Sequence, residues 1–195
     1  MTVSAGQIKE LREKTGAGIS DVKKALEENG GDFQKALASI ERKLGSSAGK
    51  RFGRETKAGL IGSYVHSNGR IGSMVELLCE TDFVARNSGF RELAHDLAMH
   101  VAAMSPRFLS LEDIPAEVWE EEKKHIEMEF KNLGKPQNIL EEMIKGKLQS
   151  HFQNSVLMEQ LFVKDPDKTV GDLLKKAIGK FGENIKIGKF IRFEV

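Results

Sequence analysis

The spacing of apolar residues changes near Gly59 from a helical period to alternation, and this change most constrains the fold. Before residue 45, apolar residues recur at intervals of three and four, which is typical of amphipathic helices. After Gly59, two alternating runs flank Asn68-Gly69, a dipeptide that favours the turn of a β-hairpin. A chain that keeps the two patterns in separate segments is expected to have an α+β fold.

The first 45 residues contain closely spaced signals for the starts and ends of helices. Ser4 and Gln7 form a capping box, in which each side chain can bond the other residue's backbone N–H. Gly16 is placed to end this first helix, and Asp32 is placed to start the third. We therefore predict a three-helix domain over residues 1–45. Helices this short bury little core, so part of their apolar surface should remain for a partner.

Residues 46–57 lack an apolar period and are predicted to be a linker. The segment includes four basic residues, Lys50, Arg51, Arg54 and Lys57. A short run of this kind is more often solvated than bound to a ligand, but it could also contact the phosphates of RNA. A nucleic-acid binder usually has a basic excess, whereas this chain balances 30 basic against 29 acidic residues. The solvated linker is therefore the favoured interpretation.

Residues 58–195 are predicted to form one core domain. The hairpin is followed by helical stripes, the clearest of them between Phe90 and Met104 and between Val170 and Phe181. The chain ends in a third alternating run, with these apolar residues expected on one side of a strand: Ile185, Ile187, Ile191, Phe193 and Val195. We expect this strand to join the hairpin in a three-stranded antiparallel sheet that is packed with helices.

Composition places the protein among soluble cytoplasmic ones. Its single cysteine, Cys79, cannot form an intrachain disulfide, which fits a reducing compartment. No run of apolar residues is long enough to span a membrane, and the first residues do not resemble a signal peptide. With a net charge of +1, the chain is expected to bind proteins in preference to nucleic acids or membranes.

No group of residues has the spacing of a catalytic, cofactor or metal site. The sequence has no phosphate-binding loop of the form GxxxxGK[ST]. His95 and His100 are five residues apart, so a helix would separate them, whereas a metal pair on a helix uses an interval of four. Cys79 ends an apolar run and is predicted to be a small core residue instead of a nucleophile. The residues therefore favour binding over catalysis, without a cofactor.

Residues 80–86 combine the end of a strand with a large aromatic beside a carboxylate, Phe83 next to Asp82. In one interpretation, Phe83 is a hydrophobic staple that packs the next helix, starting near Asn87 or Ser88, onto the sheet. In the other interpretation, Phe83 projects from a rigid turn and anchors a protein interface. The residues alone leave both interpretations open.

Five segments of the chain match a set of long motifs in a fixed order. Residues 11–18 (LREKTGAG) and 21–26 (DVKKAL) match an N-terminal signature. Residues 76–86 (ELLCETDFVAR) match a second signature, and residues 162–166 (FVKDP) and 191–195 (IRFEV) match a C-terminal pattern. Together they resemble the bacterial elongation factor Ts family, whose members exchange guanine nucleotides on elongation factor Tu. The resemblance covers nearly the whole chain.

The resemblance implies a fold and a function. It implies an N-terminal domain similar to ubiquitin-associated domains and a core that docks on the G domain of elongation factor Tu. The protein would bind elongation factor Tu with GDP, displace Mg²⁺ and promote GDP release so that GTP can bind, without acting as an enzyme. By matching positions, the segment that dislodges Mg²⁺ is Thr81, Asp82, Phe83 and Val84.

The resemblance also implies further contacts with elongation factor Tu. Ile19, Val22 and Lys23 in the three-helix domain, and His66 on the core, match partner-binding positions. Ile19-Ser20 stands where many relatives have two methionines. The chain resembles the short form of the family, in which homodimers compensate for a missing second subdomain and give a 2:2 complex. Neither nucleic acid nor membrane is implied as a direct partner.

Overall fold

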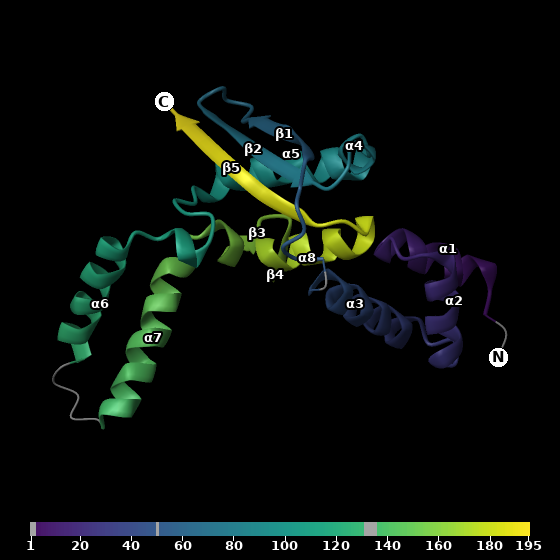
Figure 1. The fold of residues 1–195 in the computed structure, drawn as a ribbon, viewed down its shortest axis with the longest axis horizontal. Helices are drawn as coiled ribbons and strands as arrows, with labels where there is room; N and C mark the ends of the chain where they lie inside the picture. The colour runs from purple at the N-terminus through teal and green to yellow at the C-terminus, as the bar shows by residue number, and fades with distance from the viewer. Residues whose placement is uncertain (1–2, 50, 131–135) are drawn as a thin grey trace.

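The computed structural model describes residues 3–49, 51–130 and 136–195. Three groups of elements follow one another along the molecule (Figure 1). The N-terminal helices lie at one end, a sheet packed with helices lies in the middle, and a pair of helices projects at the other end. This arrangement confirms the predicted α+β fold class.

The N-terminal domain consists of α1 (Ala5–Thr15), α2 (Ile19–Glu28) and α3 (Phe33–Gly49). These helices share an apolar cluster of their own, which contains Leu11, Ala17, Val22, Ala25, Leu26, Ala36 and Ile40. The third helix continues to Gly49, beyond the boundary expected at residue 45. It therefore takes up the start of the expected linker.

Local signals set the ends of these helices as predicted. At the start of α1, Gln7 N–H donates to Ser4 Oγ at 3.2 Å, and Gln7 Oε1 accepts from Ser4 N–H at 3.1 Å. Gly16 ends α1 in the left-handed region, with a φ of 70°. Asp32 caps α3 by accepting from Lys35 N–H at 3.0 Å, and this bond lowers the pKa of its carboxyl group.

The core contains a three-stranded antiparallel sheet in the order β1 (Ala58–Val65), β2 (Ile71–Cys79) and β5 (Ile185–Glu194). The predicted hairpin and the predicted return of the last strand are both confirmed. Of the two turn residues, only Gly69 has a positive φ, at 68°. Residues 66–70 join β1 to β2, so the connection is longer than a two-residue turn. Within it, Gly69 N–H donates to His66 O.

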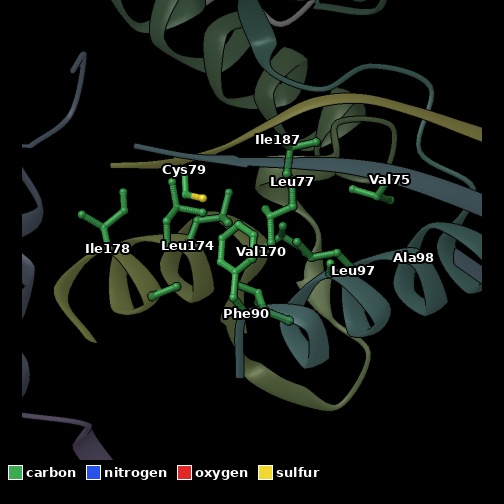
Figure 2. Close-up of a cluster of buried hydrophobic side chains, with 14 of the residues drawn as sticks. Val75, Leu77, Cys79, Phe90, Leu97, Ala98, Val170, Leu174, Ile178 and Ile187 are labelled. Carbon is green, nitrogen blue, oxygen red and sulfur yellow. The ribbon is translucent and has the colours of Figure 1, made fainter. Parts of the chain in front are cut away.

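Two helices, α5 (Ser88–Met104) and α8 (Val170–Phe181), cover one face of this sheet, here named the inner face. The buried cluster between helices and sheet includes the side chains labelled in Figure 2: Val75, Leu77, Cys79, Phe90, Leu97, Ala98, Val170, Leu174, Ile178 and Ile187. Gly62 in β1 lets α5 approach closely, because a Cβ atom there would lie 2.8 Å from Ala94 Cβ. Burial of this cluster is the main contribution to the stability of the core.

The last strand does not keep all its apolar residues on one face, so that part of the prediction is wrong. Ile187 is buried, whereas Ile191 is exposed. The register shifts between Val75 and Leu77 of β2, so that two residues of β5 lie opposite Glu76 and form a β-bulge. The extra residue reverses the alternation, and the apolar residues after the bulge are exposed: Ile191, Phe193 and Val195.

The other face of the sheet, here named the outer face, carries exposed apolar side chains beside the polar Ser63 and Glu76, and no element among the described residues covers it. Its exposed apolar side chains come from all three strands: Ile61, Val65, Met74, Ile191 and Phe193. Met74 lies on the central strand, is 45% exposed and pairs with Ile191. Exposed apolar side chains grouped in this way mark an interaction surface.

An insertion between α5 and α8 projects from the core as a pair of helices, α6 (Ala116–Phe130) and α7 (Gln137–Gln153) (Figure 1). The rings of Trp119 and Phe152 stack between these helices, with 5.2 Å between their centroids. Four short elements flank the pair: η1 (Leu111–Asp113), η2 (Leu157–Glu159), β3 (Leu161–Phe162) and β4 (Asp165–Thr169). No helix in the described ranges is both long and apolar enough to cross a membrane.

A buried polar network joins α5 to the chain that follows the projecting helices. His100 Nδ1 accepts from Val163 N–H at 3.2 Å, so its neutral ring carries the proton on Nε2 and donates to Gln160 Oε1 at 2.9 Å. Gln160 Nε2 donates in turn to the backbone oxygens of Asn154, at 2.6 Å, and Met104, at 3.3 Å. Burial lowers the pKa of His100, because the charged ring would be desolvated.

We expect this network to make stability depend on pH. In the unfolded chain His100 titrates near its ordinary pKa of about 6.5. Its pKa is lower in the folded chain, so the free energy of unfolding should fall as the pH drops below about 6.5. His100→Gln should flatten this fall, as measured by denaturant unfolding between about pH 5.5 and 7.5. The exposed His95 supplies the control His95→Gln, and equal pH slopes in both variants would contradict the role of His100.

Candidate partner-binding site

The turn after β2 presents Phe83 to solvent. Thr81 starts the short helix α4 (Asp82–Ala85), and its Oγ1 accepts from Val84 N–H at 3.5 Å. Val84 is buried in the core and fixes the inner side of this helix, whereas Phe83 is 83% exposed. The interpretation of Phe83 as a staple is therefore wrong, and its side chain projects.

Glu183, which follows α8, holds this turn in place. Its carboxylate accepts from the backbone N–H groups of Glu80, at 3.1 Å, and Thr81, at 3.0 Å, and from the Thr81 hydroxyl at 2.5 Å. Glu80 Oε1 accepts in return from Asn184 N–H at 2.6 Å. Hydrogen bonds to charged acceptors are stronger than neutral ones, so this reciprocal arrangement makes the turn rigid. No local sequence pattern indicates Glu183, because it lies 103 positions away from Glu80 along the chain.

Cys79 lies beneath the turn as a small core residue, as predicted. It is fully buried, and its Sγ–H donates to Thr81 O at 3.3 Å. Burial raises the pKa of the thiol, and the nearby carboxylate of Glu183 adds to this rise. A buried and protonated thiol is a poor nucleophile, so Cys79 supports the turn by packing.

Asp82 stands beside Phe83 on the exposed side of α4. Its carboxylate lies 3.9 Å from the Arg86 guanidinium, and both side chains are exposed. An exposed ion pair of this length contributes little to stability. Together with Asn87, these residues line a shallow hollow next to the aromatic ring. Aromatic, acidic and basic groups are thus available to a partner where α4 lies at the edge of the molecule (Figure 1).

The predicted contact residues of the N-terminal domain differ in exposure. Ile19 is 55% exposed at the start of α2, and the exposed Lys23 ammonium lies 3.8 Å from the Glu27 carboxylate. Val22 is fully buried among the three helices. The assignment of Val22 to a partner contact is therefore corrected, because its side chain packs the helix that presents Ile19 and Lys23.

His66 lies at the opposite end of the sheet from Phe83. It belongs to the β1–β2 connection, where its N–H donates to Ile71 O at 2.8 Å and its Nδ1 lies 3.0 Å from Tyr64 Oη. Strand β2 runs from this connection to the turn of Phe83, a length of roughly 25 Å. The structure does not bring His66 and Phe83 together, and a partner would have to span the sheet to contact both.

Two basic residues of the expected linker are paired with acids. Arg54 lies 3.7 Å from Glu80, and Lys57 lies 3.1 Å from Glu55. Lys50 lies outside the described residues. Basic groups that carboxylates already neutralise attract phosphates less, which weakens the RNA interpretation. Within the part of the chain that the structure describes, no group of three or more His, Cys, Asp or Glu residues could hold a metal ion.

The fold and the turn define an α+β protein that displays an aromatic side chain at the end of its sheet. The sequence profile of the family described as Elongation factor TS matches residues 4–195. The chain therefore belongs to the elongation factor Ts family, as its motifs indicate, and it is a translation elongation factor.

Curated relatives match the chain along its full length. It is 50% identical over 195 residues to Elongation factor Ts of Fervidobacterium nodosum, which covers 100% of this chain and 99% of that protein. It is 50% identical over 193 residues to Elongation factor Ts of Thermosipho melanesiensis, covering 99% and 98% of the two chains. It is 49% identical over 195 residues to Elongation factor Ts of Thermotoga maritima, covering 100% and 97%.

Proposed function

We propose that the protein is a guanine-nucleotide exchange factor for elongation factor Tu in the cytoplasm. It binds elongation factor Tu with GDP, displaces Mg²⁺ and promotes GDP release so that GTP can bind. The observation that carries this proposal is the exposure of Phe83 on a turn that Glu183 and the buried Val84 hold in place. An aromatic side chain on a rigid turn loses little entropy when it binds, which suits an interface anchor.

In this proposal the protein acts by packing, without bond-making and without an enzyme's catalytic groups. A G protein holds GDP through phosphate contacts and a bridging Mg²⁺ ion, which requires near-ideal octahedral geometry. Phe83 inserts beside the phosphate-binding region with Asp82 next to it, and small displacements of the ligands then release the ion. Burial of the Phe83 ring supplies about 1.5 to 3 kcal/mol, worth roughly tenfold to a hundredfold in an equilibrium.

Exchange then follows from the coupling of two binding equilibria. Elongation factor Tu has a state in which it binds nucleotide poorly. A factor that prefers this state lowers the affinity of elongation factor Tu for GDP. By the same ratio, GDP lowers the affinity for the factor. The factor therefore leaves once GTP has bound, and it needs no cofactor of its own.

The N-terminal domain and the hairpin provide further contacts in this proposal. Ile19 and Lys23 are exposed on α2 and contact the same G domain as Phe83. His66 lies at the far end of β2, so it contacts a different part of elongation factor Tu. A mixed apolar and charged contact at Ile19 and Lys23 is typical of a protein interface.

We also propose that a second copy of the chain covers the outer face of the sheet. Five exposed apolar side chains from three strands lie together on this face, and grouped apolar side chains of this kind mark an interaction surface. A sheet face can pack on its own copy about a two-fold axis, because the same residues then face each other. The resulting homodimer binds two molecules of elongation factor Tu in a 2:2 complex.

The release of a fluorescent GDP analogue from elongation factor Tu tests the exchange function. We expect the release rate to rise with the concentration of the chain and then to saturate. Binding to elongation factor Tu without faster release would favour a scaffold that does not exchange nucleotide. An RNA affinity that falls steeply with salt would favour a nucleic-acid partner instead.

A further inference from the structure

The N-terminal domain packs on the core through a close contact between α3 and α8 (Figure 1). A Cβ atom on Gly179 of α8 would lie 2.7 Å from Leu44 Cβ and 3.1 Å from Leu44 O. Only glycine therefore lets the two helices approach to this distance. Glycine is otherwise unfavourable inside a helix, so the close approach of α3 explains why α8 has a glycine at this position. Across the same interface, Lys176 Nζ lies 3.6 Å from Glu41 Oε1.

Lys180 extends this contact to α1 and α5. Its aliphatic chain lies against Gly16, where a Cβ atom would overlap Lys180 Cγ and lie 3.0 Å from Lys180 Cδ. Gly16 also has a φ of 70°, so both its conformation and its neighbour require glycine. Lys180 Nζ reaches the first turn of α5, 3.7 Å from the Cβ position of Gly89.

This contact sets how far apart the two candidate contact segments lie. Gly16 leads directly into the loop before Ile19. Gly89 lies in the first turn of α5, next to the hollow that Phe83 lines. The side chain of Lys180 touches both glycine positions, so the length of one lysine separates the loop before Ile19 from the helix start beside Phe83.

We infer that Gly16, Gly179 and Lys180 form a joint that fixes the orientation of the N-terminal domain on the core, so that Ile19 and Phe83 reach one partner together. This inference rests on the proposed function, because that partner is the G domain of elongation factor Tu. Two contact segments on one rigid body act at a high effective concentration, which independent motion of the domains would lower. The three residues are positioning residues and need not touch the partner themselves.

The test compares Gly179→Leu with Gly146→Leu in the full chain. Gly146 also lies in a helix, α7, but a Cβ atom there would meet nothing within 4 Å. Gly179→Leu should separate the two domains while each keeps its own apolar cluster. In NMR relaxation measurements on the chain alone, residues of α1 to α3 should then tumble faster than the core. In Gly146→Leu, both parts should tumble together.

The exchange assay provides the functional readout for the same variants. In Gly179→Leu, the chain concentration that gives half-maximal GDP release should rise at least about tenfold, while the maximal rate is largely kept. A merely structural role would lower the amount of folded chain without changing how the domains tumble.

Domains that still tumble together in Gly179→Leu would overturn the inference. An unchanged half-maximal concentration after the domains have separated would overturn it as well. If Gly179→Leu does not fold, Gly179→Ala keeps the test, because the Cβ atom alone overlaps Leu44. A wild-type chain that leaves GDP release unchanged would overturn the proposed function. The NMR measurement on the Gly179 variant would still show whether this joint fixes the orientation of the N-terminal domain on the core.

Discussion

Phe83→Ala should slow the catalysed release of GDP from elongation factor Tu roughly tenfold to a hundredfold, because it removes about 1.5 to 3 kcal/mol of apolar burial from the complex. The fold should be unaffected, since the ring is 83% exposed and the bonds from Glu183 go to Glu80 and Thr81. Substitutions at such exposed positions usually change stability by less than about 0.5 kcal/mol. Stopped-flow fluorescence measures the rate, and thermal unfolding measures the stability.

Phe52→Ala is the matched control for this prediction. Phe52 lies between α3 and β1 and is 75% exposed, so the substitution removes the same ring from a second exposed position. We expect wild-type release rates in Phe52→Ala. Wild-type rates in Phe83→Ala would contradict its role as the anchor, and unfolding of Phe83→Ala would show that the ring stabilises the turn instead.

Met74→Lys should convert the proposed homodimer into monomers. Met74 lies on the central strand of the outer face and pairs with Ile191, so a lysine there would bury a charge in the dimer. A two-fold interface contains the substitution twice. At about 2 kcal/mol for each copy, the dimer dissociation constant should rise roughly a thousandfold. Sedimentation velocity over a range of chain concentrations measures this change.

Met128→Lys makes the same substitution away from the sheet. Met128 lies on α6 and is 71% exposed, so its replacement should leave the molecular mass in solution unchanged. Neither substitution should destabilise the monomer, because both side chains are exposed in the single chain. A wild-type chain that sediments as a monomer at all concentrations, or a Met74→Lys variant that stays dimeric, would contradict the proposed dimer.

Element boundaries follow from the sequence where both partners of a signal lie close along the chain. The capping boxes at Ser4 and Thr169 and the cap at Asn87 act over two or three residues, and the structure contains all of them. The alternation of β5 fails after Ile187, where Gly188 and Lys189 lie opposite Glu76 in the bulge. The glycine inside the apolar run is a local sign of a bulge, which the alternation by itself does not include. Pattern alone therefore predicts the strand but not the exposed face of its second half.

The site is predictable only in part for the same reason. The motif identifies residues 81–84, but the exposure of Phe83 depends on the burial of Val84 and the bonds from Glu183. Glu183 follows another helix, so no local pattern connects it with the turn. Val22 is a neighbour of Lys23 along the chain, yet successive residues of a helix point about 100° apart, and Val22 is buried.

GDP release from elongation factor Tu, measured at increasing concentrations of the wild-type chain, tests the exchange function most directly. We predict a rate that rises to a plateau far above the spontaneous rate. We also predict a smaller acceleration after Mg²⁺ has been removed with a chelator, because the chain then has no ion to displace. A rate that stays at its spontaneous value while the chain is bound to elongation factor Tu would contradict the proposed function.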